Sequence, residues 1–145
     1  MEFKYNDGGR LEAGYKDNPN GCVVRSIAIA SGIPFKKVYK DLFELSKEFN
    51  LKKTARYRGK SHPGNAVHKK VYHDYILSLG ATWVPKMSIG SGCTVHLKSG
   101  ELPGDKRLVV STSKHLTSVI NGVINDTFDP SRDGKRCVYG YYIFE

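Results

Sequence analysis

The dipeptide Asn121-Gly122 constrains the fold of this chain more than any other feature. It separates two short stretches, 115–120 and 123–128, that are rich in β-branched residues, and Asn-Gly is the strongest short signal for a two-residue β-hairpin. Two further strands are expected at 107–112 and 136–144, where valines and aromatic residues are frequent. The C-terminal part of the chain is therefore expected to form an antiparallel sheet.

The N-terminal part of the chain has helical periodicity instead. Apolar residues recur at three- and four-residue spacing in 22–31, 34–50 and 67–79, and a glycine follows the first and third of these stretches. A short strand is expected at 81–85. Helices first and strands afterwards is an α+β order, without the alternation that a parallel sheet needs. The predicted fold is α+β, with N-terminal helices packed against a C-terminal antiparallel sheet.

Length and cysteine usage predict the organisation and the compartment. A chain of 145 residues can bury a core without a metal or a disulfide, so residues 1–145 are expected to form a single domain. The polar first residues lack the apolar segment of a secretory signal, and no apolar run has membrane-spanning length. Cys22, Cys93 and Cys137 leave one cysteine unpaired in any disulfide scheme. We therefore expect a cytoplasmic protein with three free thiols.

Cys22 opens the first expected helix, directly after the turn-forming run Asn18-Pro19-Asn20-Gly21. The unpaired N–H groups and the positive dipole end of a helix N-terminus lower the pKa of a cysteine, and the thiolate is the nucleophilic form. The same N–H groups, with the side-chain amide of Asn20 or Asn18, are candidate donors to an oxyanion. The alternative is a small buried cysteine behind an ordinary helix cap.

The register of the hairpin places a carboxylate near His115. With a two-residue turn, residue 117 faces residue 126, so Asp126 lies diagonally across from His115 on one face of the hairpin. A carboxylate there accepts the imidazole N–H, fixes the tautomer and supports the imidazolium that forms when a thiol is deprotonated. Asp129 falls on the opposite face by parity, and Asp126 is therefore preferred. The alternative is a solvated hairpin with an incidental histidine and a turn-forming aspartate.

Two stretches of the sequence carry a resemblance to a known family. Residues 20–32 (NGCVVRSIAIASG) and 114–127 (KHLTSVINGVINDT) resemble the papain-like cysteine hydrolase superfamily, in particular its small bacterial and bacteriophage members and the bacteriocin-processing leader peptidases. The resemblance implies a papain-like α+β fold and a catalytic triad of Cys22, His115 and Asp126. The leader peptidases use an Asp that precedes Pro, which would nominate Asp129.

The same resemblance implies the chemistry. It predicts a thiol hydrolase, a peptidase or amidase, that acts on a peptide or protein substrate through a thioester acyl-enzyme and needs no cofactor. A bacteriophage accessory protein of this kind would act in the host cytoplasm.

The distribution of charge suggests a second class of function. The chain has 23 Lys and Arg against 14 Asp and Glu, and the stretch between Lys52 and Lys70 contains no acidic residue. Tyr57, His62 and His68 are interleaved with its cations, so that rings could stack on bases while cations bind phosphates. The alternative function is a catalytically inactive papain-like fold that binds nucleic acid or another polyanion. A solvated surface segment would have the same composition.

A metal site has only slight support in the sequence. Cys93 and His96 have the spacing of a metal-ligand pair, and Cys137 could complete a site only through the fold. No second paired motif accompanies them, and a histidine in a Val-His-Leu run is more often a surface residue. The sequence therefore predicts no metal.

Overall fold

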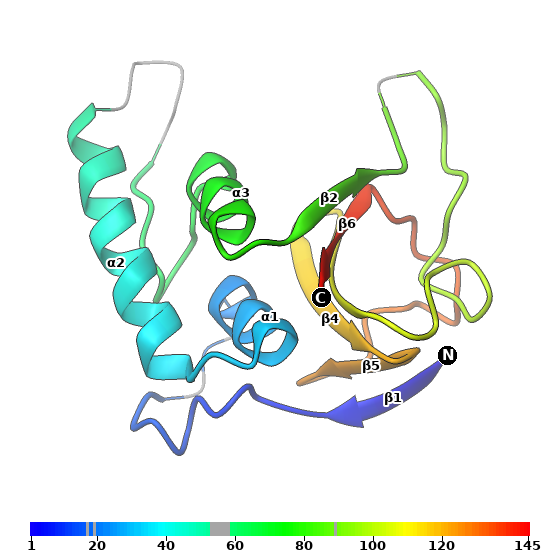
Figure 1. Ribbon diagram of the computed structural model, residues 1–145, viewed down its shortest axis with the longest axis horizontal. Helices are drawn as coiled ribbons and strands as arrows, with labels where there is room; N and C mark the ends of the chain where they lie inside the picture. The colour runs from blue at the N-terminus through cyan, green and yellow to red at the C-terminus, as the bar shows by residue number, and fades with distance from the viewer. Residues whose placement is uncertain (17, 19, 53–58, 89) are drawn as a thin grey trace.

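The computed structural model describes residues 1–145 except 17, 19, 53–58 and 89. Its helices and strands follow the chain in the order β1 (Glu2–Tyr5), α1 (Cys22–Ser31), α2 (Phe35–Lys52), α3 (Lys69–Ser78), β2 (Thr82–Pro85), β3 (Arg107–Thr112), β4 (His115–Ile120), β5 (Val123–Asp126) and β6 (Gly140–Phe144) (Figure 1). These strands form one sheet in the order β1-β5-β4-β3-β6-β2. The α+β class expected from the sequence is confirmed.

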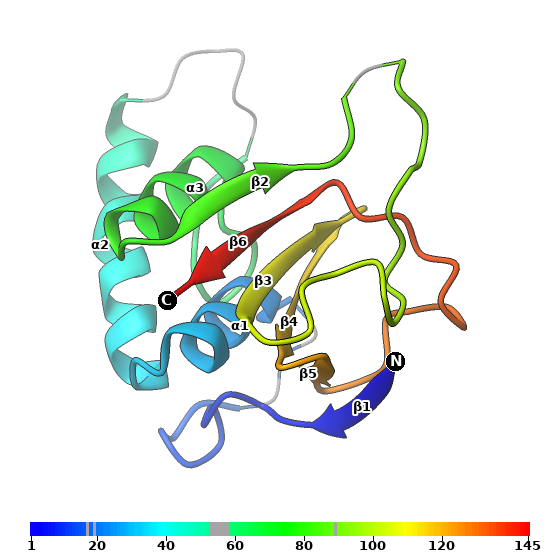
Figure 2. The ribbon, with the colours of Figure 1, turned by 45° about the vertical axis from the view of Figure 1, so that its right-hand side comes forward.

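The helices and the sheet form adjoining layers, with α1 between the sheet and α2 (Figures 1 and 2). One apolar cluster joins the helices to the sheet, and a second joins the sheet to the segment that precedes β3. Strand β3 contributes to both, because Val109 packs in the first cluster while its neighbours Leu108 and Val110 pack in the second. This alternation is the period of two that a strand buried on both faces requires.

Helix α1 has the bounds that the sequence predicts. Its Val24, Ile27 and Ala30 side chains are fully buried, and Gly32 ends it in the left-handed conformation at φ 78°, with its N–H donating to the Ala28 carbonyl at 3.0 Å. Contacts with β4 fix the position of this helix on the sheet. None of the helices in the described residues is both long and apolar enough to cross a bilayer.

The hairpin of β4 and β5 has the predicted register. Ile120 lies opposite Val123 across the two-residue turn, as the sequence predicts. Asn121 and Gly122 have φ values of 49° and 81°, the positive values that a type I′ turn requires. Strand β5 ends at Asp126, earlier than expected, and β6 is also shorter than its predicted range.

The prediction of an antiparallel sheet is wrong at one edge, where a parallel pair of strands makes the sheet mixed. Strand β1 pairs with β5 in parallel, with Glu2 opposite Val123 and Tyr5 opposite Asp126. All four residues of β1 are exposed, so the strand lacks the apolar alternation by which sequence analysis finds strands. Its pairing covers the edge of β5, the strand that ends in Asp126.

The expectation of three free thiols is wrong for two of the cysteines. Cys93 and Cys137 form a disulfide, and Cys22 is free. A β-bridge pairs His96 with Cys137, and the Cα atoms of the two bonded cysteines lie 5.8 Å apart. The pairing depends on this contact between two loops, which sequence spacing does not reveal.

Candidate active site

The structure brings Cys22 and His115 together. Cys22 is the first residue of α1 and His115 is the first residue of β4, the strand on which α1 packs. Cys22, His115 and Leu116 line one pocket, and interactions of the Cys22 sulfur with the His115 side chain and the Leu116 backbone lower the pKa of the thiol. The thiol therefore lies at the N-terminus of a helix and within reach of a base.

Asp126 holds the other side of the imidazole. The His115 Nε2 atom is 2.8 Å from Asp126 Oδ2, which leaves Nδ1 as the ring nitrogen for the thiol. The Phe128 ring packs against the imidazole with centroids 5.1 Å apart. Asp129 takes no part, because it is exposed and its Oδ1 accepts from the Ser131 backbone N–H at 2.9 Å. The partner of the histidine is thus the aspartate that hairpin parity favours.

Asp126 is itself held by three further donors. Thr117 Oγ1 donates to Oδ2 at 2.7 Å, while the Thr127 backbone N–H at 2.7 Å and the Arg25 guanidinium at 3.2 Å donate to Oδ1. The Arg25 and Asp126 side chains are only 2% and 1% exposed, so they form a buried ion pair. With His115, the carboxylate therefore has four hydrogen-bond partners.

Sequence reasoning did not find Arg25 or Thr117, although the sequence contains a signal for each. Arg25 is the one charged residue of α1, one turn after Cys22, and a buried helical face tolerates a charge only with a partner. Thr117 lies opposite position 126 in the hairpin register that the sequence predicts. Both signals become specific only once α1 is known to pack against β4.

The surroundings of Cys22 favour the thiolate. Burial raises the pKa of the Cys22 thiol, but the hydrogen bonds from His115 and Leu116 and the positive charges of His115 and Arg25 outweigh it, so the pKa lies below its ordinary value. A lowered pKa makes a cysteine more reactive, because a larger fraction of it is then the nucleophilic thiolate.

The histidine and the aspartate are shifted in opposite directions. Burial lowers the pKa of His115, yet its bonds to Asp126 and Cys22 raise it to about 8. Burial raises the pKa of Asp126, and the bonds from His115 and Thr117 with the charge of Arg25 bring it below its ordinary value. Near neutral pH the histidine is therefore an imidazolium beside a carboxylate, and its positive charge favours ionisation of the neighbouring thiol.

A pocket of about 350 Å³ opens beside this group. The lining comes from three parts of the chain: the start of α1, the segment that leads into α3 with the first residues of that helix, and the turn between β3 and β4. The lining residues are Asn20, Cys22, Val23, Asn65, Ala66, Val67, Lys69, Tyr72, Thr112, Lys114, His115 and Leu116. Burial and the nearby Cys22 thiolate raise the pKa of Tyr72 to about 12, so its hydroxyl stays neutral at physiological pH.

The two candidate oxyanion donors lie in different places. Asn20 lines the pocket, with its side-chain nitrogen 3.3 Å from Asn65 Oδ1. Asn18 does not line it, and its side-chain nitrogen donates to the Gly64 carbonyl. Asn20 is therefore the amide that shares the pocket with the thiol, whereas Asn18 binds the Gly64 carbonyl outside the pocket lining.

Only part of the basic stretch can be placed. Residues 53–58, including Tyr57, lie outside the described residues. Of its two histidines, His62 accepts a hydrogen bond from the Gly64 N–H at 2.9 Å, and His68 caps α3 by accepting from the Lys70 N–H. Both rings thus contribute to local structure, and the polyanion site remains an untested prediction.

Comparison of the chain with family models, with curated proteins and with solved structures gave no match in any of the three. The function is therefore argued from the geometry of the site.

Proposed function

We propose that the protein is a papain-like thiol hydrolase, a peptidase or amidase that acts in the cytoplasm. One observation carries the proposal: the Cys22 and His115 side chains interact at the lining of one pocket, and the His115 imidazole is hydrogen-bonded to the Asp126 carboxylate. Nucleophile, base and orienting group in this order are the components of thiol hydrolysis.

The Cys22 thiolate attacks the carbonyl carbon of the substrate, and the carbonyl oxygen becomes an oxyanion. The helix N-terminus supplies backbone N–H groups without intrahelical partners, and Asn20 supplies a side-chain amide, to stabilise that charge. As the tetrahedral intermediate collapses, the C–N bond breaks and the His115 imidazolium gives its proton to the leaving amine. This leaves a thioester on Cys22.

Water completes the cycle. His115, now neutral, accepts a proton from a water molecule that attacks the thioester, and the Cys22 thiolate leaves as the carboxylic acid forms. Asp126 keeps the imidazole in the productive orientation throughout, and Arg25 and Thr117 keep Asp126 in place. Each described member of the site thus has a defined part in the reaction.

The lining of the pocket bears on the substrate. Lys69 and Lys114 are its charged groups besides the catalytic pair, and no carboxylate is among the described lining residues. Such a pocket favours neutral or anionic groups next to the scissile bond. A peptide bond, a side-chain amide, an isopeptide bond and a peptidoglycan cross-link all pass through the same thioester.

Alkylation tests the proposal without a known substrate. In protein treated with a reductant and a chelator, iodoacetamide near neutral pH is expected to modify Cys22 at least about tenfold faster than Cys93 or Cys137. Cys22 lies at a helix N-terminus beside a buried His115–Asp126 pair, whereas the His96 and Glu101 side chains next to Cys93 are 35% and 31% exposed. A His115→Gln variant should lose this advantage. The three rates are measured by mass spectrometry of the digested protein.

Equal rates at the three cysteines would contradict the proposal. That result would favour the alternative function, an inactive fold that binds a polyanion through the basic stretch. Folding of the variant is checked by its circular dichroism spectrum.

A further inference from the structure

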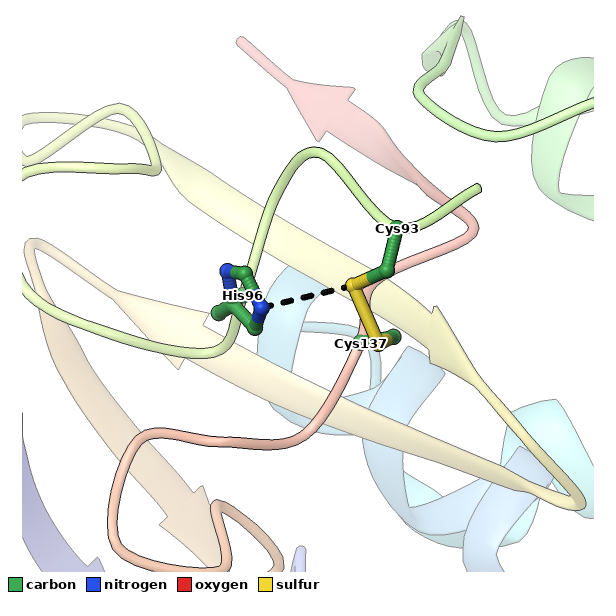
Figure 3. A group of neighbouring side chains, drawn as sticks. All are labelled: Cys93, His96 and Cys137. Atoms are coloured by element: carbon green, nitrogen blue, oxygen red, sulfur yellow. Dashed lines mark hydrogen bonds between the residues drawn. A yellow bond between two sulfur atoms is a disulfide. The ribbon is translucent and has the colours of Figure 1, made fainter. Parts of the chain in front are cut away.

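A second group of chemically active side chains lies outside the pocket, where two loops meet. Cys93 and His96 belong to the segment before β3, and Cys137 belongs to the segment that leads into β6 (Figure 3). Backbone hydrogen bonds of 2.8 Å join the segments on either side of the His96–Cys137 bridge. None of the three residues lines the Cys22 pocket. This group therefore needs an explanation of its own.

His96 is oriented as a ligand. Its Nε2 atom points at the Cys93 sulfur from 3.4 Å, as Figure 3 shows, while its Nδ1 atom lies 3.2 Å from Glu101 Oε1. The carboxylate also accepts the His96 backbone N–H at 3.3 Å. A carboxylate on one ring nitrogen places the proton there and leaves the lone pair of the other nitrogen available, which is the usual arrangement behind a metal-bound histidine.

The three potential ligand atoms are close together. The two sulfurs and a His96 ring nitrogen all lie within 4.8 Å of one another, and all three residues are half-buried. Two thiolates and an imidazole are ligands that select zinc over harder cations such as magnesium. A pocket of about 330 Å³ lined by His96 and Glu101 gives solvent access to this corner.

We propose that Cys93, His96 and Cys137 form a zinc site when the two cysteines are reduced. A dithiol reductant transfers two electrons and two protons to the Cys93–Cys137 bond and is itself oxidised to a disulfide. Zn²⁺ then binds both sulfurs as thiolates, which releases the two protons, and His96 binds through Nε2. Water fills the fourth position of the tetrahedron.

The site gives the chain a cross-link in either redox state. In an oxidising compartment the disulfide joins the two loops, and in a reducing compartment, where such bonds are rare, the metal replaces it. The loops carry Leu97 and Val138, which are fully buried in the second apolar cluster. The cross-link therefore holds in place residues that cover one face of the sheet. This inference departs from the sequence prediction of no metal, because the third ligand is brought in by the fold.

Metal analysis of the full chain tests the inference. The protein is purified with a phosphine reductant and supplied zinc, and zinc and free thiols are then quantified. About one zinc per chain is expected in the wild type and in Cys22→Ser, and loss of that zinc is expected in Cys93→Ser, Cys137→Ser and His96→Ala. Cys22→Ser is the matched control because it removes a cysteine outside the site.

Cobalt keeps the test decisive if a variant fails to fold. The reduced wild type with Co²⁺ should show the visible absorption of tetrahedral cobalt and a thiolate charge-transfer band, and zinc should abolish both. Reduced protein with three free thiols and no bound metal would overturn the inference. Zinc content unchanged by Cys93→Ser and Cys137→Ser would overturn it as well, and so would a disulfide that persists in the reductant.

Discussion

A Cys22→Ser variant is expected to hydrolyse p-nitrophenyl acetate no faster than the uncatalysed background, at least about a thousandfold below the wild type. Serine keeps the size of the side chain, but its hydroxyl ionises far less readily than a thiol, and the surroundings of Cys22 act by stabilising a thiolate. The rate is measured by release of p-nitrophenol. An early burst in the wild type should coincide with an acetyl group on Cys22, detected by mass spectrometry.

The control for this prediction is an unchanged fold. Cys22 contacts the apolar core only in part, so the serine variant should have nearly the melting temperature of the wild type. If Cys22→Ser retained the burst and the turnover of the wild type, Cys22 would not be the nucleophile and the proposed mechanism would fail.

Replacing Asp126 by Ala is expected to lower the free energy of unfolding by about 3–5 kcal/mol, because it leaves the Arg25 guanidinium buried without its counter-ion. The same change removes the acceptor of His115 and Thr117. Chemical denaturation monitored by circular dichroism measures the loss. Since folding lowers the pKa of Asp126, this stabilisation is present above about pH 4 and is lost as the pH falls through the folded-state value.

The neighbouring aspartate provides a matched control. Asp129 is exposed and accepts a hydrogen bond from a local backbone N–H, so Asp129→Ala should cost no more than about 1 kcal/mol. Asp126→Asn, which keeps the size and one acceptor oxygen, should fall between the two alanine variants. Equal destabilisation by Asp126→Ala and Asp129→Ala would contradict the importance of the buried ion pair.

Local patterns of the sequence were enough to predict the elements that position the site. Helical spacing from Cys22 and a glycine after Ser31 define α1, and Asn121-Gly122 fixes the register that sets His115 diagonal to Asp126. Both depend on interactions between residues that are close in the chain. Such features can be inferred from one sequence without knowledge of the fold.

Features that depend on contacts between distant segments could not be predicted. Strand β1 has four exposed residues and is held by its pairing with β5, and the Cys93–Cys137 disulfide depends on two loops meeting. The role of Arg25 likewise becomes visible only when α1 lies against the hairpin. In each case the contacting residues are at least 44 positions apart in the sequence, and sequence spacing does not show that they are close in space.

The most direct test of the central claim is the pH at which the Cys22 thiolate forms. It is followed by thiolate absorbance in the ultraviolet, with Cys22→Ser as the blank. In the wild type the thiolate should form below the ordinary pKa of a cysteine, and an imidazolium should persist beside it up to about pH 8. In His115→Gln the pKa of Cys22 should rise. Titration of Cys22 at the ordinary value in both proteins would show that thiol and imidazole are not coupled and would contradict the account.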